Sequence, residues 1–102
     1  MSNTAEKQQR KNSDKVNEYF VRIYTEYNKD VCPKTLIFLV KNEAIKPVFV
    51  RQWVAWHYYN ETRKSGVKKW PAHNQTADYL GLECAEAVRY LLKNFKFSLP
   101  TN

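Results

Sequence analysis

The stretch Gln75-Thr76-Ala77-Asp78-Tyr79-Leu80-Gly81-Leu82 has the pattern of a short helix that ends at a tight turn. Ala77 is small, which suits a place where two helices approach closely, and Leu80 and Leu82 put apolar side chains on both sides of the bend. Gly81 can adopt the positive φ that such a turn requires. Together with an apolar stripe at helical spacing over residues 83–95, the stretch predicts two helices that meet at Gly81, and with them an α-helical fold.

Three other segments predict helices. Residues 13–29 carry apolar side chains at steps of three and four, which places them on one helix face. Residues 33–43 begin with proline, which suits a first helical turn. Their apolar block would also fit a buried strand, but the chain has no second β-rich run to pair with it. Residues 47–64 predict a long aromatic helix that ends at Ser65-Gly66, and residues 67–73 a basic connector.

The length and composition predict one domain. A chain of 102 residues is large enough for a single core, and it contains only two glycines and four prolines. Residues 1–12 are polar and lack apolar periodicity, so we interpret them as a flexible basic arm. The expected architecture is all-α, with about five helices in one compact domain over residues 13–99 and one or two helix-turn-helix-like units.

Several classes of protein are disfavoured. No apolar run approaches the roughly 20 residues that span a bilayer, and the N-terminus does not have the pattern of a secretion signal, so we expect a cytoplasmic or nucleoid-associated protein that is not secreted. We interpret Cys32 and Cys84 as small packing residues, because with His57 and His73 they lack the spacing of a zinc site. Without a phosphate-binding glycine loop or a nucleophile beside a base, the sequence predicts neither an enzyme nor a cofactor or metal.

The charge favours a polyanionic partner. The chain holds 17 Lys and Arg against 10 Asp and Glu, which gives a formal net charge of +7. The excess is concentrated between residues 41 and 73, where only Glu43 and Glu61 oppose it. Lysines that merely keep a helical protein soluble are the plainer alternative.

The stretch from Gln75 to Leu82 resembles helix-turn-helix DNA-binding proteins, in particular the T-A-x-Y-L-G-L openings of excisionase-like and related small regulators. The resemblance implies a DNA-binding protein that acts as a small transcriptional regulator or as a recombination or replication accessory factor. In such proteins, apolar residues follow the turn residue at +1, +6 and +9, because these side chains face the first helix. Counted from Gly81, they are Leu82, Ala87 and Tyr90, and counted from Ala44, a second candidate turn, they are Ile45, Val50 and Trp53.

Charge separates the two candidate units. A helix in the major groove should present hydrogen-bond donors near its N-terminus, and the earlier unit presents Arg51 and Gln52 there, whereas the later helix begins with two carboxylates. We therefore predict that residues 47–64 make the main DNA contacts and that residues 75–95 form a structural or accessory helix pair. Two ordinary helical hairpins in a bundle are the alternative.

Arg51 and Gln52 are expected to read base edges, and the other cations to neutralise phosphates. The expected partner is double-stranded DNA, with a homodimer as an open alternative. The predicted nucleic-acid-binding residues are Lys41, Lys46, Arg51, Gln52, Arg63, Lys64, Lys68, Lys69 and Arg89.

Aromatic residues near these cations predict a stacking surface or a protein interface, because base faces stack on aromatic rings. One face of the aromatic helix over residues 47–64 is expected to remain open for this purpose. Two other functions stay open: a small helical protein–protein interaction module, such as a phage or mobile-element inhibitor or adaptor, and an RNA or single-strand binder. The predicted stacking or interface residues are Trp56, Tyr58, Tyr59 and Trp70.

Overall fold

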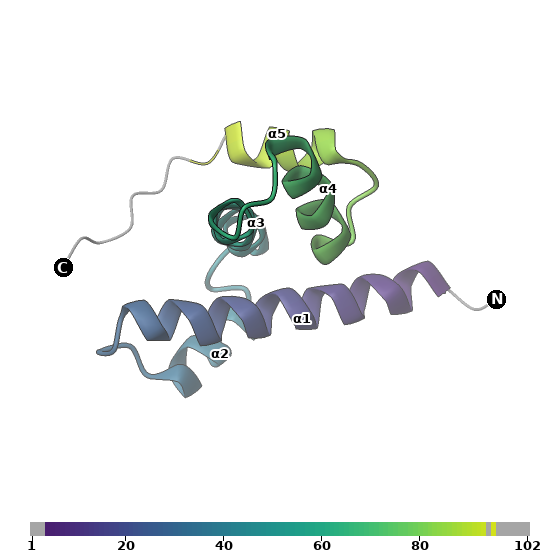
Figure 1. Ribbon diagram of the computed structural model, residues 1–102. Helices are drawn as coiled ribbons and strands as arrows, with labels where there is room; N and C mark the ends of the chain where they lie inside the picture. The colour runs from purple at the N-terminus through teal and green to yellow at the C-terminus, as the bar shows by residue number, and fades with distance from the viewer. Residues whose placement is uncertain (1–3, 94, 96–102) are drawn as a thin grey trace.

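Short turns join five α-helices in the computed structural model. The structure describes the backbone of residues 4–93 and 95, and the side chains of residues 14–93 and 95. Figure 1 shows the long α1 crossing the molecule, with α2 on one side of it and α3, α4 and α5 on the other. The described residues contain no strand, so the predicted all-α fold with about five helices is confirmed. The helices are α1 (Thr4–Tyr27), α2 (Pro33–Lys41), α3 (Pro47–Lys64), α4 (Lys69–Leu80) and α5 (Ala85–Lys93).

The start of α1 differs from the prediction. The helix begins at Thr4, not at residue 13, so residues 4–12 of the predicted arm are helical. This segment has no apolar stripe, but it is rich in Ala, Glu, Lys, Gln and Arg, which favour helix intrinsically. Residues 1–3, 94 and 96–99 of the predicted arm and domain lie outside the described residues.

The predicted connector over residues 67–73 is also wrong in its second half. Helix α4 begins at Lys69, six residues before the expected start at Gln75. The pair Trp70-Pro71 lies in the first turn of this helix, where proline is tolerated because the N–H that it lacks would have no partner within the helix.

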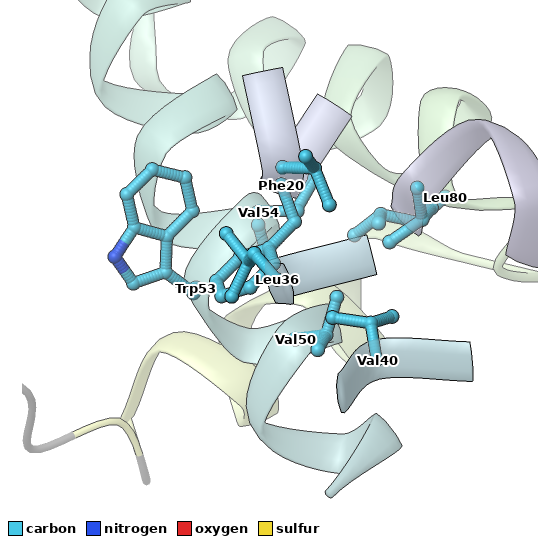
Figure 2. Packing of buried hydrophobic residues seen from close by; sticks show 10 residues of the cluster. Phe20, Leu36, Val40, Val50, Trp53, Val54 and Leu80 are labelled. Carbon is cyan, nitrogen blue, oxygen red and sulfur yellow. The ribbon is translucent and has the colours of Figure 1, made fainter. Parts of the chain in front are cut away.

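The core forms where α1, α2, α3 and α4 meet, and Figure 2 shows its side chains gathered beside α3. Trp53 is fully buried and packs edge-to-face on Phe20 of α1, with 5.3 Å between ring centroids and 88° between ring planes. Aromatic side chains contribute the largest buried areas in a core of this size. The buried cluster consists of Val16, Phe20, Val21, Leu36, Val40, Val50, Trp53, Val54, Ala55 and Leu80.

A buried histidine links α3 to α1. The Tyr19 hydroxyl lies 2.6 Å from His57 Nδ1, and the Tyr27 hydroxyl lies 3.3 Å from His57 Nε2. The His57 ring also stacks on Trp53, with 5.3 Å between centroids. Because a neutral imidazole has one donor and one acceptor nitrogen, one tyrosine donates to the ring and the other accepts from it. Burial lowers the pKa of His57 and so favours this neutral form.

The free energy of unfolding is therefore expected to fall as the pH drops below about 6.5. Since the pKa of His57 is lowered in the fold, the unfolded chain binds more protons between the folded pKa and 6.5. The stabilisation is complete above this window and is lost on acidification through it. The carboxylates of Glu61 and Glu26 oppose the effect, and Lys64 reinforces it.

Urea unfolding of the wild type and of His57→Gln, at pH values on either side of 6.5, measures this contribution. The wild type should lose more stability on acidification than the variant, which has no ionisable group at this position. Equal losses in the two proteins would show that other groups cause the pH dependence.

The turn after α4 has the backbone that Gly81 predicts. Gly81 adopts a φ of +72°, in the left-handed region, and the N–H of Leu82 donates to the Ala77 carbonyl at 2.9 Å. A glycine in the left-handed conformation is a common way for a helix to end, and here it terminates α4. Ala77 and Leu80 are buried, as their small size and apolar character predict.

The side chains of α5 are rotated relative to the helix-turn-helix pattern. Tyr90, which the pattern expects to face α4, is 70% exposed, whereas Ala85 and Val88 are buried. The inner face of α5 is therefore set by Ala85 and Val88, and the prediction for Tyr90 is wrong.

The earlier candidate unit is buried as predicted but does not form a hairpin. Val50 and Trp53 are in the core and Ile45 packs against it. However, α2 packs mainly on α1, while α3 packs on α1, α4 and α5. The positive φ in the connecting turn is +58° at Glu43 rather than at Ala44, a conformation that is unfavourable for a residue with a Cβ.

Both cysteines are exposed free thiols, so their interpretation as packing residues is wrong. Cys32 is the N-cap residue of α2, and Cys84 directly precedes α5, so each lies just before the start of a helix. Hydrogen bonding by the backbone N–H and hydroxyl of Thr35 favours the thiolate and lowers the pKa of Cys32.

Candidate nucleic-acid interface

Helix α3, the predicted DNA-contacting helix, is the central helix of the fold. It packs on α1, α4 and α5, and none of its residues from 52 to 60 is exposed. A helix that enters the major groove needs a free side along its length, so this central position does not suit the predicted role. The aromatic residues that were expected to form an open face, Trp56, Tyr58 and Tyr59, are half-buried. The predicted cations are instead found at the two ends of α3, about 18 Å apart along the axis from Arg51 to Arg63.

At the start of α3, acidic residues balance the cations. Arg51 is exposed and lines a cleft of about 500 Å³ together with Lys41, and Asp14 and Glu43 line the same cleft. Two carboxylates beside two cations leave little net positive charge to attract phosphates.

Two other predicted residues lie near this end. Lys46 is exposed at the N-cap of α3, whereas Gln52 is half-buried. Arg51 and Lys46 are thus accessible to a phosphate, and base reading by Arg51 and Gln52 stays a prediction.

The end of α3 and the start of α4 meet at a corner with an excess of positive charge. Four exposed cations surround the short connection between the helices, and we call them the basic corner: Arg63, Lys64, Lys68 and Lys69. The connection is held by a hydrogen bond from Arg63 Nη1 to the Val67 carbonyl at 3.2 Å. Glu61 lies 3.4 Å from Lys64 Nζ, but an ion pair this exposed to solvent is weak.

The first turn of α4 adds to the positive potential at the basic corner. Its N-cap residue, Lys68, makes no capping side-chain hydrogen bond, and the turn contains no acidic residue. Unpaired N–H groups and the helix dipole favour anions at such an end. The basic corner therefore combines side-chain and backbone groups that attract phosphate.

An aromatic row leads from the core to the basic corner. Tyr59 and His73 lie 4.6 Å apart between ring centroids, and His73 and Trp70 lie 5.6 Å apart. Trp70 is 48% exposed, whereas Tyr59 is half-buried and His73 is buried. The remaining predicted stacking residues are occupied within the fold: Tyr58 stacks on Tyr79 at 4.5 Å, and Trp56 packs on Trp53 and Phe95.

Helix α5 completes the segment that resembles helix-turn-helix proteins. Its Arg89 is exposed and lies 3.9 Å from the carboxylate of Glu86, and an ion pair with both side chains this exposed is weak. Comparisons of the chain with protein-family models, with curated proteins and with solved structures give no match. The helix-turn-helix resemblance therefore stays a prediction.

The described residues provide neither a metal site nor a membrane-spanning helix. No group of three or more His, Cys, Asp or Glu side chains among them could hold a metal ion. Within the same part of the chain, no helix has both the length and the apolar character to cross a membrane.

The sequence analysis did not predict two cation–π contacts made by residues of α1. Lys15 Nζ lies 4.0 Å from the centre of the Tyr79 ring, and the Arg22 guanidinium lies 5.7 Å from the centre of the Tyr19 ring. The cation–π contact of Lys15 joins α1 to α4, whereas that of Arg22 lies within α1. The three-residue spacing of Tyr19 and Arg22 was visible in the sequence, whereas the aromatic partner of Lys15 depends on how α1 packs against α4.

Proposed function

We propose that the protein binds double-stranded DNA and that the basic corner holds its phosphate backbone. The observation that carries the proposal is the set of four exposed cations around one short turn, with Glu61 as the carboxylate paired among them. Phosphate contacts supply most of the affinity of non-specific DNA binding, because bound cations release counterions from the duplex. A role as a small regulator or accessory factor accords with the size and charge of the chain and remains part of the proposal.

The corner also has a suitable shape. Its side chains are exposed where α3 ends and α4 begins, so they can reach a phosphate backbone without rearrangement of the core. The central helix then serves as a rigid support, because Trp53, Val54 and Ala55 fix it within the bundle.

Salt dependence tests the proposal. Four phosphate contacts predict a slope of about −3.6 in a plot of log affinity against log salt concentration, or about a hundredfold loss between 50 and 200 mM salt. The double variant Lys68→Gln/Lys69→Gln should lower the affinity and reduce the slope to about −1.8. Fluorescence anisotropy of a labelled duplex measures both quantities.

The chain offers a matched control. Lys29→Gln/Lys34→Gln removes the same net charge from exposed positions at the α1–α2 end, and Figure 1 shows α2 on the opposite side of α1 from α4. This variant should keep the wild-type slope. A slope that falls equally in both variants would show that net charge alone attracts DNA. No binding of the wild type in low salt would overturn the proposal.

A protein-interaction module is the second candidate function, and one observation favours it. Phe38 and Ile37 of α2 are 64% and 39% exposed, and apolar side chains exposed side by side commonly mark protein contacts. The duplex titration separates the candidates, because a protein-docking module has no reason to show a steep salt dependence for DNA.

A further inference from the structure

Trp70 is the most exposed of the three tryptophans. It is 48% exposed in the first turn of α4, directly after Lys68 and Lys69 of the basic corner. An indole placed in water gains free energy when an apolar or aromatic surface covers it. Of the three tryptophans, Trp53 is fully buried and Trp56 is half-buried against Trp53 and Phe95. Trp70 is thus the tryptophan most accessible to a ligand.

The fold holds Trp70 in place. Its ring lies 5.6 Å from that of the buried His73, one helical turn further along α4. His73 Nδ1 lies 2.8 Å from the Lys69 carbonyl, and since a carbonyl only accepts, Nδ1 carries the proton and donates. The His73 ring is packed on its other side by Tyr59 of α3. Ring contacts with a fixed neighbour reduce the freedom that Trp70 would lose on binding.

A duplex covers most of its base faces by stacking. An aromatic side chain therefore finds a free base face only at an unpaired nucleotide or at the end of a duplex. Proteins that bind single strands combine such rings with cations that follow the backbone, and this combination is present where Trp70 adjoins Lys68 and Lys69.

We propose that Trp70 stacks on an unpaired base while the basic corner holds the neighbouring phosphates, so that the preferred partner is duplex DNA with a short single-stranded end. This proposal rests on the proposed function, because it requires that the basic corner binds DNA. In this proposal, Trp70 selects DNA that has an unpaired base. The cations of the basic corner supply the affinity for any DNA.

Three labelled DNAs test the proposal: a blunt duplex, the same duplex with a short thymine overhang, and the same duplex with an overhang of abasic residues. The two overhangs carry equal numbers of phosphates and differ only in their bases. The wild type should bind the thymine overhang about tenfold more tightly than the abasic one, which corresponds to the lower part of the range for one stacked base. Overhangs at the 5′ and 3′ ends are compared separately.

Trp70→Ala should abolish the preference for thymine over abasic overhangs and should lower the affinity for the thymine overhang more than the affinity for the blunt duplex. Trp70→Phe, which keeps an aromatic ring, should retain part of the preference. Circular dichroism of both variants verifies that the helices remain folded. In a Trp56→Phe background, the thymine overhang should quench the Trp70 fluorescence and the abasic overhang should not.

Failure of this proposal can be distinguished from failure of the proposed function. Equal wild-type affinity for thymine and abasic overhangs, or a preference that survives Trp70→Ala, would overturn stacking while DNA binding stands. Absence of binding to all three DNAs in low salt would overturn both proposals. Tighter binding of an RNA overhang than of a thymine overhang would also contradict the choice of DNA as the partner.

Discussion

Replacement of Trp53 by alanine is expected to lower the free energy of unfolding by about 3–5 kcal/mol. The Trp53 side chain is fully buried and contacts both Phe20 and His57, so its removal leaves a cavity between α1 and α3. Domains of this size are stable by only about 5–15 kcal/mol, so the loss is a large part of the total. Urea unfolding followed by circular dichroism measures it without relying on tryptophan fluorescence.

Two variants serve as controls for Trp53→Ala. The same substitution at Trp70, which is half exposed, should cost much less. Trp53→Phe should cost less than Trp53→Ala, because it keeps a ring and removes the buried Nε1–H, for which the described residues provide no acceptor. A Trp53→Ala protein as stable as Trp70→Ala would contradict the central position of Trp53 in the core.

Val88→Asp is expected to have the second largest effect, a loss of about 3–5 kcal/mol if the carboxylate stays buried. Val88 is fully buried on the inner face of α5, whereas the two cations of that helix, Arg89 and Lys93, are exposed and do not share its buried surroundings. A helix of nine residues is not stable alone, so α5 should detach before the other helices unfold. Hydrogen exchange of the α5 amides, together with urea unfolding, measures local and global losses separately.

Arg89→Asp is the matched control for Val88→Asp. It introduces the same carboxylate one residue later, on the exposed face of α5, although it also removes a positive charge and so breaks the weak pair with Glu86. Its effect should stay within about 0.5 kcal/mol. Equal losses in the two variants would show that α5 does not dock through Val88.

Sequence signals predicted α3 well because both of its ends carry local markers. Pro47 suits a first helical turn, and Ser65-Gly66 follows the last one. The start of α4 was missed because Trp70-Pro71 has the composition of a loop, although proline fits the first turn equally well. The start of α1 was missed because apolar periodicity detects only helices with a buried stripe.

The central position of α3 could have been recognised from its composition. Aromatic and apolar residues fall on more than one side of this helix, a pattern typical of helices that are covered all round. The basic corner is different, because its four cations were predicted one by one. Their meeting depends on the geometry of the α3–α4 connection, and the Trp70–His73 pair becomes visible only when α4 is known to begin at Lys69.

The crowding of cations at the basic corner has a cost for the free protein. Four like charges around one short turn repel one another, and this self-repulsion acts against the compact state whenever no anion is bound. Dissolved salt screens the repulsion over about 10 Å at 0.1 M ionic strength. Added salt should therefore weaken DNA binding. In the unbound protein it should raise the free energy of unfolding, so that salt has opposite effects on affinity and on stability.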